Sequence, residues 1–199
     1  MKIILASTSV YRATLLNKLS VPFTCQAPNV DESALIGESI QQQVKRLAQL
    51  KAMTVAQTLV DGYVIGSDQL ASCHNLILGK PGHYQNAHAQ LTQLSGQTVA
   101  FHTGLCLINA ATGEQQTIVE CFEVEFKNIS DKQIQRYLEL EQPYDCAGSF
   151  KSEGLGIALF KRLNGRDPNT LVGLPLIALT ELFANWQVDL FDYMQDNNN

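Results

Sequence analysis

The sequence predicts an α/β fold whose sheet contains both parallel and antiparallel strands. Short apolar runs at 2–6 and 64–70 are typical of buried strands, and segments with helical spacing lie between them. Two longer strand-like stretches, 98–108 and 116–126, are separated by a loop that ends in Gly113, as in a hairpin. Strands alternating with helices and then an antiparallel pair indicate a mixed sheet covered by helices.

Size and composition restrict the class of protein. The 199 residues can bury a core as one domain or as two small lobes, and 45% hydrophobic with 17% charged residues is ordinary for a soluble protein. The net charge of −5 argues against a nucleic-acid partner. Five cysteines without a Cys-x-x-Cys motif favour neither disulfides nor zinc, so we expect a reducing compartment, the cytoplasm.

Neither a membrane partner nor a secretion signal is expected. No stretch approaches the roughly 18 apolar residues of a membrane span, and the first apolar run is too short for a signal peptide. The polar end of the chain, from about 194 to 199, is expected to be a disordered tail.

The first strand-to-helix turn predicts an anion site. After the strand at 2–6, Ser7 and Ser9 offer caps for a helix that runs to about Leu19, and free N–H groups at a helix start attract phosphate. Arg12, one turn into this helix, could fork onto a phosphate or a base edge. An ordinary capped helix with a surface arginine is the alternative.

The next charged residues of interest are two adjacent acids after an extended segment and a lysine in the following helix. An extended segment at 23–30 ends in Asp31 and Glu32, which matter only if they face Asp68. Ser39 caps a helix to about Leu59, and Lys51 falls within its apolar stripe. Lys51 must therefore either extend to the surface or reach an anionic group.

The chain is organised around the strand at 64–70 and the turn at 78–82. We expect Asp68 where the strand ends, the usual place for ligand chemistry in open α/β sheets. Lys80 lies in a Gly-Lys-Pro-Gly turn. A carboxylate and an ammonium brought together suit a metal ion and a phosphate chain, whereas an Asx turn beside a solvated lysine is the alternative.

The second half of the chain is predicted as helix, hairpin, helix, glycine-rich loop and final helix. The helices are expected at 86–94, 130–140 and from Pro175 to about Trp186. The loop at 144–156 carries Glu153 among several glycines, which indicates either backbone close to a ligand or a flexible surface loop. A short strand at 157–160 and a turn at 164–169 precede the last helix.

Taken in order, these motifs resemble the Maf-like nucleoside triphosphate pyrophosphatases over nearly the whole chain. The matching residues are Leu5-Ala-Ser-Thr-Ser-Val-Tyr-Arg-Ala-Thr-Leu-Leu16, Asp31-Glu32, Lys51, Gly66-Ser-Asp-Gln69, Leu78-Gly-Lys-Pro-Gly82, Ser95-Gly-Gln97, Thr103-Gly104, Asp145-Cys-Ala-Gly148, Glu153-Gly154 and Val172-Gly-Leu-Pro-Leu176. The resemblance implies a Maf/ITPase-like fold: a long mixed sheet flanked by helices, with two lobes around a central cleft, in a homodimer.

The resemblance also implies a reaction and roles for individual residues. Water would attack the α-phosphorus of a nucleotide and release pyrophosphate, with Mg²⁺, Mn²⁺ or Co²⁺ as the divalent metal cofactor. Asp68 is the expected general base, Glu32 and Asp68 are the expected metal ligands, and Asp68 could serve as base, ligand or both. The phosphate-binding residues are then Ser7, Ser9, Lys51 and Lys80.

Residues beside the aspartate indicate a subgroup. Members acting on dTTP and UTP usually have threonine on both sides of it and glutamine in the glycine loop, whereas this chain has Ser67, Gln69 and Glu153. The combination resembles the 7-methyl-GTP subgroup and implies that Arg12, Gln69 and Glu153 select the substrate. The alternatives are a pyrophosphatase for dTTP, UTP or ITP and a nucleotide-binding regulator of cell division without turnover.

Overall fold

The chain divides into two compact units in the computed structural model, which describes residues 1–195. Unit 1 comprises Met1–Gln69, His102–Glu120 and the chain from Asp167 onward, and unit 2 comprises Leu70–Phe101 and Cys121–Arg166. Three long strands contribute residues to both units. The expected cleft between two lobes stays a prediction.

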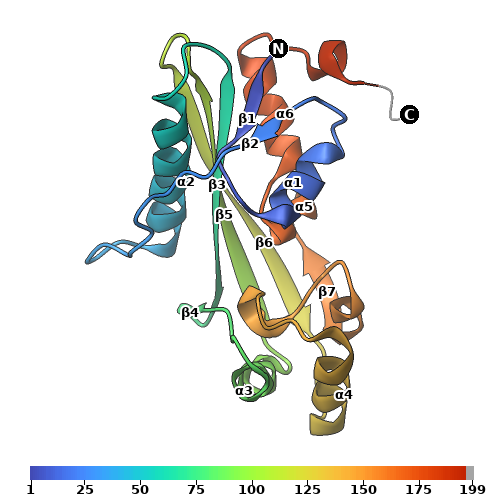
Figure 1. The fold of residues 1–199 in the computed structure, drawn as a ribbon. Helices are drawn as coiled ribbons and strands as arrows, with labels where there is room; N and C mark the ends of the chain where they lie inside the picture. Colours follow the sequence, from blue (N-terminus) through green and yellow to red (C-terminus); the bar gives the residue numbers. More distant parts are fainter. Residues whose placement is uncertain (196–199) are drawn as a thin grey trace. The chain divides into compact units, whose positions relative to one another are not determined.

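The described residues form one seven-stranded sheet (Figure 1). Its strands are β1 (Ile3–Leu5), β2 (Thr24–Cys25), β3 (Tyr63–Cys73), β4 (Leu76–Leu78), β5 (Thr98–Asn109), β6 (Gln115–Phe126) and β7 (Phe160–Asn164). The order is β2-β1-β3-β5-β6-β7, with β4 paired to β3. β1 is parallel to β2 and β3, whereas β4 and β7 are antiparallel to β3 and β6, which confirms the predicted mixed sheet.

Helices flank this sheet. They are α1 (Val10–Asn17), α2 (Ile40–Ala56), α3 (Tyr84–Leu94), α4 (Asp131–Glu141), α5 (Asn169–Val172) and α6 (Leu176–Asn185), with short 3-10 helices η1 (Ala147–Ser149), η2 (Leu155–Leu159) and η3 (Leu190–Tyr193). Capping boxes begin α2 at Ser39 and α4 at Ser130, where caps were predicted. Within residues 1–195, no helix has both the length and the apolar character needed to cross a membrane.

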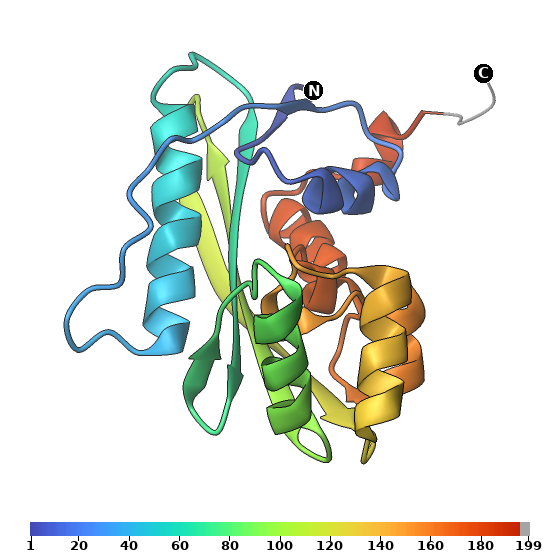
Figure 2. The ribbon, with the colours of Figure 1, turned by 60° about the horizontal axis from the view of Figure 1, so that its bottom comes forward.

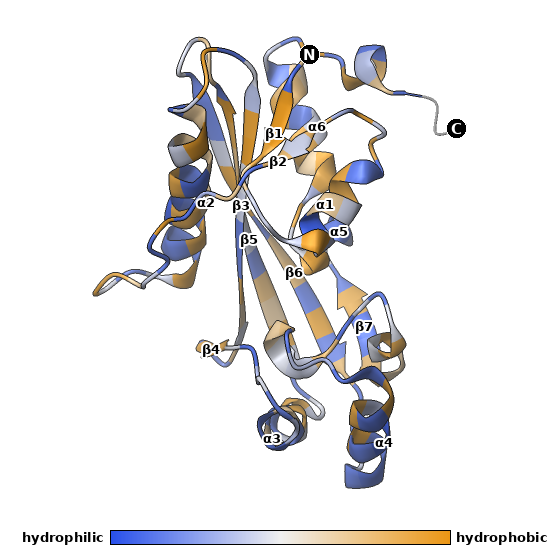
Figure 3. Ribbon diagram, viewed as in Figure 1, coloured by the Kyte–Doolittle hydropathy of each residue, from blue (hydrophilic) through white to orange (hydrophobic). Residues whose placement is uncertain are grey.

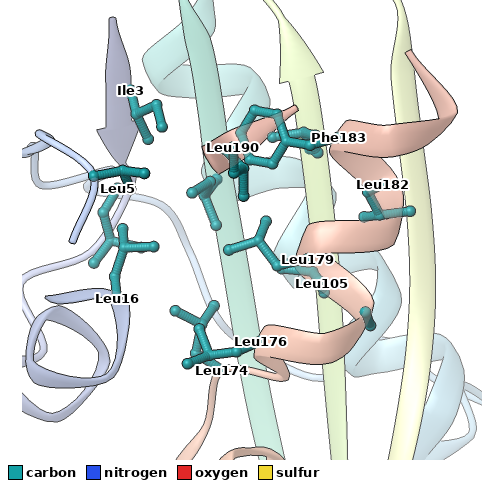
Figure 4. Packing of buried hydrophobic residues seen from close by; sticks show 14 of the residues in the cluster. Ile3, Leu5, Leu16, Leu105, Leu174, Leu176, Leu179, Leu182, Phe183 and Leu190 are labelled. Carbon is teal, nitrogen blue, oxygen red and sulfur yellow. The ribbon is translucent and has the colours of Figure 1, made fainter. Parts of the chain in front are cut away.

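Strand alternation divides the core of unit 1 between two faces of the sheet. Ile4 and Val64 pack with Ala48, Ala52 and other residues of α2, and we call this side the α2 face. The intervening strand residues, such as Leu5 and Ile65, pack against α1 and α6 on the opposite side, the α6 face (Figure 4). β1 is hydrophobic along its length because it is buried on both sides (Figure 3).

Unit 2 is held by a helix pair and a group of aromatic rings. α3 and α4 lie side by side (Figure 2). The rings of Phe126, Phe150 and Phe160 meet edge to face with centroids 5.0–5.5 Å apart. A hairpin that the sequence analysis did not predict joins β3 to β4, with His74 and Asn75 at positive φ.

One predicted strand was wrong, one extended segment contains only a short strand, and one turn was predicted correctly. Residues 155–159 form η2 rather than a strand, and β7 begins only at Phe160. β7 is mostly exposed and is held by polar pairs to β6, such as Lys161 Nζ to Glu125 Oε1 at 2.6 Å, so no apolar pattern marks it. The extended segment at 23–30 contains a strand only at 24–25, and the turn at 164–169 leads into α5.

The end of the chain is described only in part. The Gln195 backbone N–H donates to the Ser20 carbonyl at 2.8 Å. Residues 196–199, which make up most of the expected disordered tail, lie outside the described residues.

Candidate active site

One lysine joins two acidic side chains in unit 1. Lys51 Nζ lies 2.7 Å from Asp68 Oδ1 and 2.8 Å from Glu32 Oε1. The side chains of Lys51 and Asp68 are only 6% and 7% exposed, whereas that of Glu32 is 58% exposed. The lysine therefore reaches an anionic group and does not extend to the surface, and Glu32 shares this lysine with Asp68.

Close packing of α2 on β3 places the lysine at this point. A Cβ at Gly66 would clash with the Ala48 carbonyl oxygen and would lie 2.7 Å from the Ala52 nitrogen. Only glycine therefore lets the strand approach the helix so closely. Lys51 lies in the same turns of α2, on its buried face, and its ammonium reaches the next α2-face residue of β3, Asp68.

The predicted position of Asp68 at a strand end was wrong. β3 continues to Cys73, because Ala71–Cys73 pair with β4 in the hairpin that was not foreseen. The parallel pairing of β1 with β3, in contrast, ends where Leu5 meets Ile65. Asp68 thus lies just beyond the end of the parallel pairing but inside its own strand, where the backbone ladder fixes its direction.

The two neighbouring acids have different roles. Asp31 Oδ1 accepts hydrogen bonds from the N–H and the hydroxyl of Ser33, at 2.9 and 2.6 Å, and these bonds lower the pKa of Asp31. Asp31 thus closes a turn, which leaves Glu32 to meet Lys51. Arg46 holds this loop to α2, because its guanidinium donates to the Ser33 carbonyl at 3.0 Å and to Glu38 at 2.7 and 2.8 Å.

The start of α1 is capped as predicted. Ser9 is the N-cap and accepts from the Arg12 N–H at 3.4 Å, while Ser7 Oγ accepts from the Ser9 N–H at 3.0 Å. Arg12 Nε donates to the Gly173 carbonyl at 2.9 Å. Burial lowers the pKa of Arg12, while the nearby Asp68 and Glu32 carboxylates oppose this shift.

Gln69 and Ser67 face the opposite side of β3 from Asp68. Ser67 Oγ donates to the Gly173 carbonyl at 2.9 Å, the same oxygen that Arg12 holds. The Gln69 amide donates to Thr103 Oγ1 at 2.9 Å and to the Thr170 carbonyl at 2.6 Å. Arg12 and Gln69, two of the three residues expected to select the substrate, therefore contact one backbone segment, 170–173.

The remaining predicted site residues belong to unit 2. Lys80 is exposed in its turn, and Gly82 takes φ +75° while its N–H donates to the Tyr144 carbonyl at 2.9 Å. Glu153 is exposed and accepts from Ser152 Oγ at 2.8 Å. Their proximity to Asp68 stays a prediction.

Sequence reasoning missed the residues that shape the 167–177 segment. Asp167 is 1% exposed and accepts from the N–H and side-chain amide of Asn169, at 2.8 and 2.7 Å, and from the Ile177 N–H at 2.8 Å. An Asp-Pro-Asn sequence signals a turn, but nothing in it signals burial. Thr103, which lies in a motif shared with the family, accepts from the Gln69 amide and donates to the Thr170 carbonyl, and no sequence signal predicted this role.

The chain is similar in sequence to proteins of one family. The family model described as Maf-like protein matches residues 2–186. A protein named 7-methyl-GTP pyrophosphatase from Pseudoalteromonas atlantica is 58% identical over 98% of this chain and 100% of its own. Proteins of the same name from Vibrio vulnificus and Methylobacillus flagellatus are 54% and 50% identical, over 92% and 94% of this chain and 94% and 98% of their own.

A solved structure shares the fold. The Staphylococcus aureus Ham1 protein aligns with a TM-score of 0.50 at 15% identity, over 94% of this chain and 100% of its own. At this identity the likeness concerns the fold alone, and it agrees with the mixed α/β fold. The match of the family model to nearly the whole length, together with relatives above 50% identity, shows that the chain belongs to the Maf-like protein family.

Proposed function

We propose that this chain is a nucleoside triphosphate pyrophosphatase that converts 7-methyl-GTP to 7-methyl-GMP and pyrophosphate. The relatives that cover nearly the whole chain are named for this activity. The observation that carries the proposal is the buried Lys51 ammonium shared by Asp68 and Glu32. A protein that only binds a nucleotide has no need of such a base beside a phosphate-neutralising group.

The reaction is a displacement at the α-phosphorus. Water attacks this atom, its proton passes to an Asp68 carboxylate oxygen, and the bond to the oxygen that bridges the α- and β-phosphorus breaks. Pyrophosphate leaves with that oxygen. A triphosphate carries about four negative charges, so cations must neutralise it before a nucleophile approaches. Lys51 and Arg12 supply positive charge in unit 1, and the Ser7–Ser9 turn adds N–H and hydroxyl donors.

A divalent metal fits the residues present. Mg²⁺ is commonly held by one or two carboxylates together with substrate phosphates, and Glu32 and Asp68 offer two hard oxygen donors around one cationic group. Among residues 1–195 no group of three His, Cys, Asp or Glu side chains gathers for a metal, so substrate phosphates would have to complete the shell. When bound, the ion would polarise a phosphoryl oxygen and neutralise charge.

Base selection is assigned to Arg12, Gln69 and Glu153. A 7-methylguanine ring is positively charged and presents N1–H and amino donors, for which a carboxylate such as Glu153 is a suitable acceptor. Lys80 adds a cation for the phosphates. The proposal requires Lys80 and Glu153 of unit 2 to reach the nucleotide, and it includes a homodimer, which light scattering after gel filtration would detect.

The test is pyrophosphate release from 7-methyl-GTP, GTP, dTTP, UTP and ITP with Mg²⁺, Mn²⁺ or Co²⁺. We expect 7-methyl-GTP to have the highest kcat/KM and Asp68→Asn to lower it by about 10³-fold or more, because the base is lost. Asp61→Asn, an exposed aspartate of unit 1, is the matched control and should leave the rate unchanged.

Each other outcome would overturn part of the proposal. Equal or faster hydrolysis of dTTP, UTP or ITP would contradict the selectivity assigned to Gln69 and Glu153. Binding of every nucleotide without any hydrolysis would favour the regulator. Full activity in Asp68→Asn would remove Asp68 from the chemistry.

A further inference from the structure

The amide of Gln69 has only one chemically possible orientation. Its nitrogen lies 2.6 and 3.3 Å from the carbonyl oxygens of Thr170 and Leu171, and 2.9 Å from Thr103 Oγ1. Backbone carbonyls only accept hydrogen bonds, so the NH₂ group must face them. Both amide hydrogens are therefore used inside the protein.

The Thr103 hydroxyl completes this arrangement. Thr103 is fully buried, and its hydroxyl donates to the Thr170 carbonyl at 3.1 Å. A hydroxyl has one hydrogen, so a lone pair of the same oxygen accepts from the Gln69 amide. Thr103 thereby links the Gln69 side chain to the same carbonyl that Gln69 contacts directly.

The segment that supplies these carbonyls is itself fixed at both ends. Asp167 accepts from Asn169 and from the Ile177 N–H at the start of α6, which closes the segment into a loop. Near its other end, the Gly173 carbonyl accepts from Ser67 and Arg12. The amide of Gln69 is therefore held against acceptors of a segment whose two ends are fixed by hydrogen bonds.

The carbonyl oxygen of the Gln69 side chain, Oε1, therefore stays available to accept a hydrogen bond from the substrate. Gln69 is only partly buried, and within residues 1–195 no donor reaches its Oε1. A Cβ built on Gly173 would lie 3.7 Å from this oxygen and 3.5 Å from Arg12 Nε, so the oxygen and the guanidinium flank the same glycine. A base with N–H donors on its Watson–Crick edge matches this oxygen. Guanine presents two adjacent donors there, N1–H and the 2-amino group, whereas thymine and uracil present one, N3–H.

We propose that Thr103 is a positioning residue for base selection, which holds the Gln69 amide so that its oxygen, and not its nitrogen, meets the substrate. The ligand class is a purine nucleotide with N–H donors on its Watson–Crick edge. The inference rests on the proposed function for the identity of the base, but the direction of the amide follows from the hydrogen bonds alone.

The test compares Thr103→Val with Thr103→Ser. Valine has nearly the same shape without the hydroxyl, and we expect kcat/KM for 7-methyl-GTP to fall about 5- to 10-fold, the usual effect of one hydrogen bond. The loss should appear in KM more than in kcat, because the base is remote from the reacting phosphorus. Serine keeps the hydroxyl and should stay within about twofold of wild type.

A double-mutant cycle separates positioning from general damage. In a Gln69→Met background, which has no amide to orient, Thr103→Val should cause no further loss. In Thr103→Val the dTTP rate should fall less than the 7-methyl-GTP rate, because thymine offers one Watson–Crick N–H donor and 7-methylguanine offers two. An equal loss on all nucleotides, or a loss that persists in the Gln69→Met background, would overturn the proposal.

Two measurements on wild type keep the inference testable if the valine variant does not fold or if the proposed reaction is wrong. NMR of the nucleotide-free protein should show both Gln69 side-chain amide protons protected from exchange with water, and exchange at the solvent rate would contradict the orientation. Titration with 7-methyl-GMP without metal reports base binding independently of hydrolysis. If 7-methyl-GTP is not hydrolysed but 7-methyl-GMP binds tightly and Thr103→Val weakens this binding, the proposed reaction is refuted and the positioning role of Thr103 is retained.

Discussion

The two faces of β3 in unit 1 hold their neighbours by different physical means. On the α2 face, Asp68 meets side chains, namely the Lys51 ammonium and through it Glu32. On the α6 face, Ser67 and Gln69 meet backbone carbonyl oxygens of the segment 170–173. Consecutive residues of one strand therefore contact a charged cluster on one side and, on the other, a row of backbone carbonyl oxygens in residues 170–173, which we call the backbone cradle.

This difference determines how each face can fail. The α2 face depends on charge balance, so replacing Lys51 by a neutral residue leaves the buried Asp68 carboxylate without its counterion. The α6 face depends on the backbone conformation of residues 170–173. A substitution that strains these residues moves the carbonyl acceptors of Arg12, Ser67 and Gln69 together. Variants on the two faces should accordingly separate loss of chemistry from loss of substrate selection.

The largest effect is expected for Lys51→Met. Without the ammonium, pyrophosphate release should fall by at least about 10²-fold, because phosphate charge is no longer neutralised. The free energy of unfolding should fall by about 3 kcal/mol, since a buried carboxylate loses its partner. Steady-state rates, measured where circular dichroism shows a folded protein, and denaturant titration check the two expectations.

Lys45→Met is the matched control, because Lys45 lies on the exposed side of the same helix. It should retain activity and stability. The nucleotide-free Lys51→Met protein should also bind Mn²⁺ more tightly than wild type in calorimetry, since no ammonium neutralises the two carboxylates. Wild-type activity in Lys51→Met would show that the α2 face does not carry the chemistry.

Gly173→Ala should produce a smaller effect on the α6 face. Gly173 has φ +111°, which alanine adopts only with strain, so the free energy of unfolding should fall by about 1–2 kcal/mol. The KM for 7-methyl-GTP should rise about 10-fold with little change in kcat, because the carbonyl held by Arg12 and Ser67 moves.

Gly113→Ala tests whether strain alone explains that result. Gly113 also has a positive φ, +76°, and nothing lies within 4 Å of its Cβ position. It should lose stability without a change in KM. A KM increase of equal size in both variants would show that the α6 face has no particular link to substrate selection.

The contrast between the faces also explains what could be predicted from sequence. The long strands β3, β5 and β6, the capped helices and the charged residues were predictable, because hydrophobic spacing and caps such as Ser39 and Ser130 are local signals. The short strands β4 and β7 were not. Lys51 on an apolar stripe had either to extend to the surface or to reach an anionic group, and the structure shows the second. These residues are recognisable because their charge has to be compensated.

The backbone cradle gave no comparable signal. The carbonyls that orient Gln69 belong to residues of any type, and the burial of Asp167 and Thr103 depends on tertiary packing. The position of Asp68 was predicted at a strand end because the hairpin to β4 was not foreseen, and His74 and Asn75 are a weak turn signal. Side-chain chemistry was therefore predictable where backbone geometry was not.

The smallest expected effect concerns the loop that carries Glu32 to the α2 face. The hydrogen bond from Arg46 lowers the pKa of Glu38, and the Leu35 N–H adds to this shift. Because the folded pKa lies below the unfolded value, the unfolded chain binds more protons in this range, and stability rises with pH. The contribution of Glu38 is therefore complete above the unfolded pKa of about 4.3 and disappears as pH falls through the lowered folded value.

Comparison of wild type with Glu38→Gln between pH 3 and 7 measures this contribution. At pH 7 wild type should unfold at a higher temperature, by about 2 °C, and the difference should vanish toward pH 3. Glu139→Gln, which breaks the exposed pair with Arg136, should give no difference at any pH. A Glu38 difference that persists at pH 3 would mean that shape rather than charge holds the loop, and the α2 face would then resemble the α6 face in its dependence on backbone geometry.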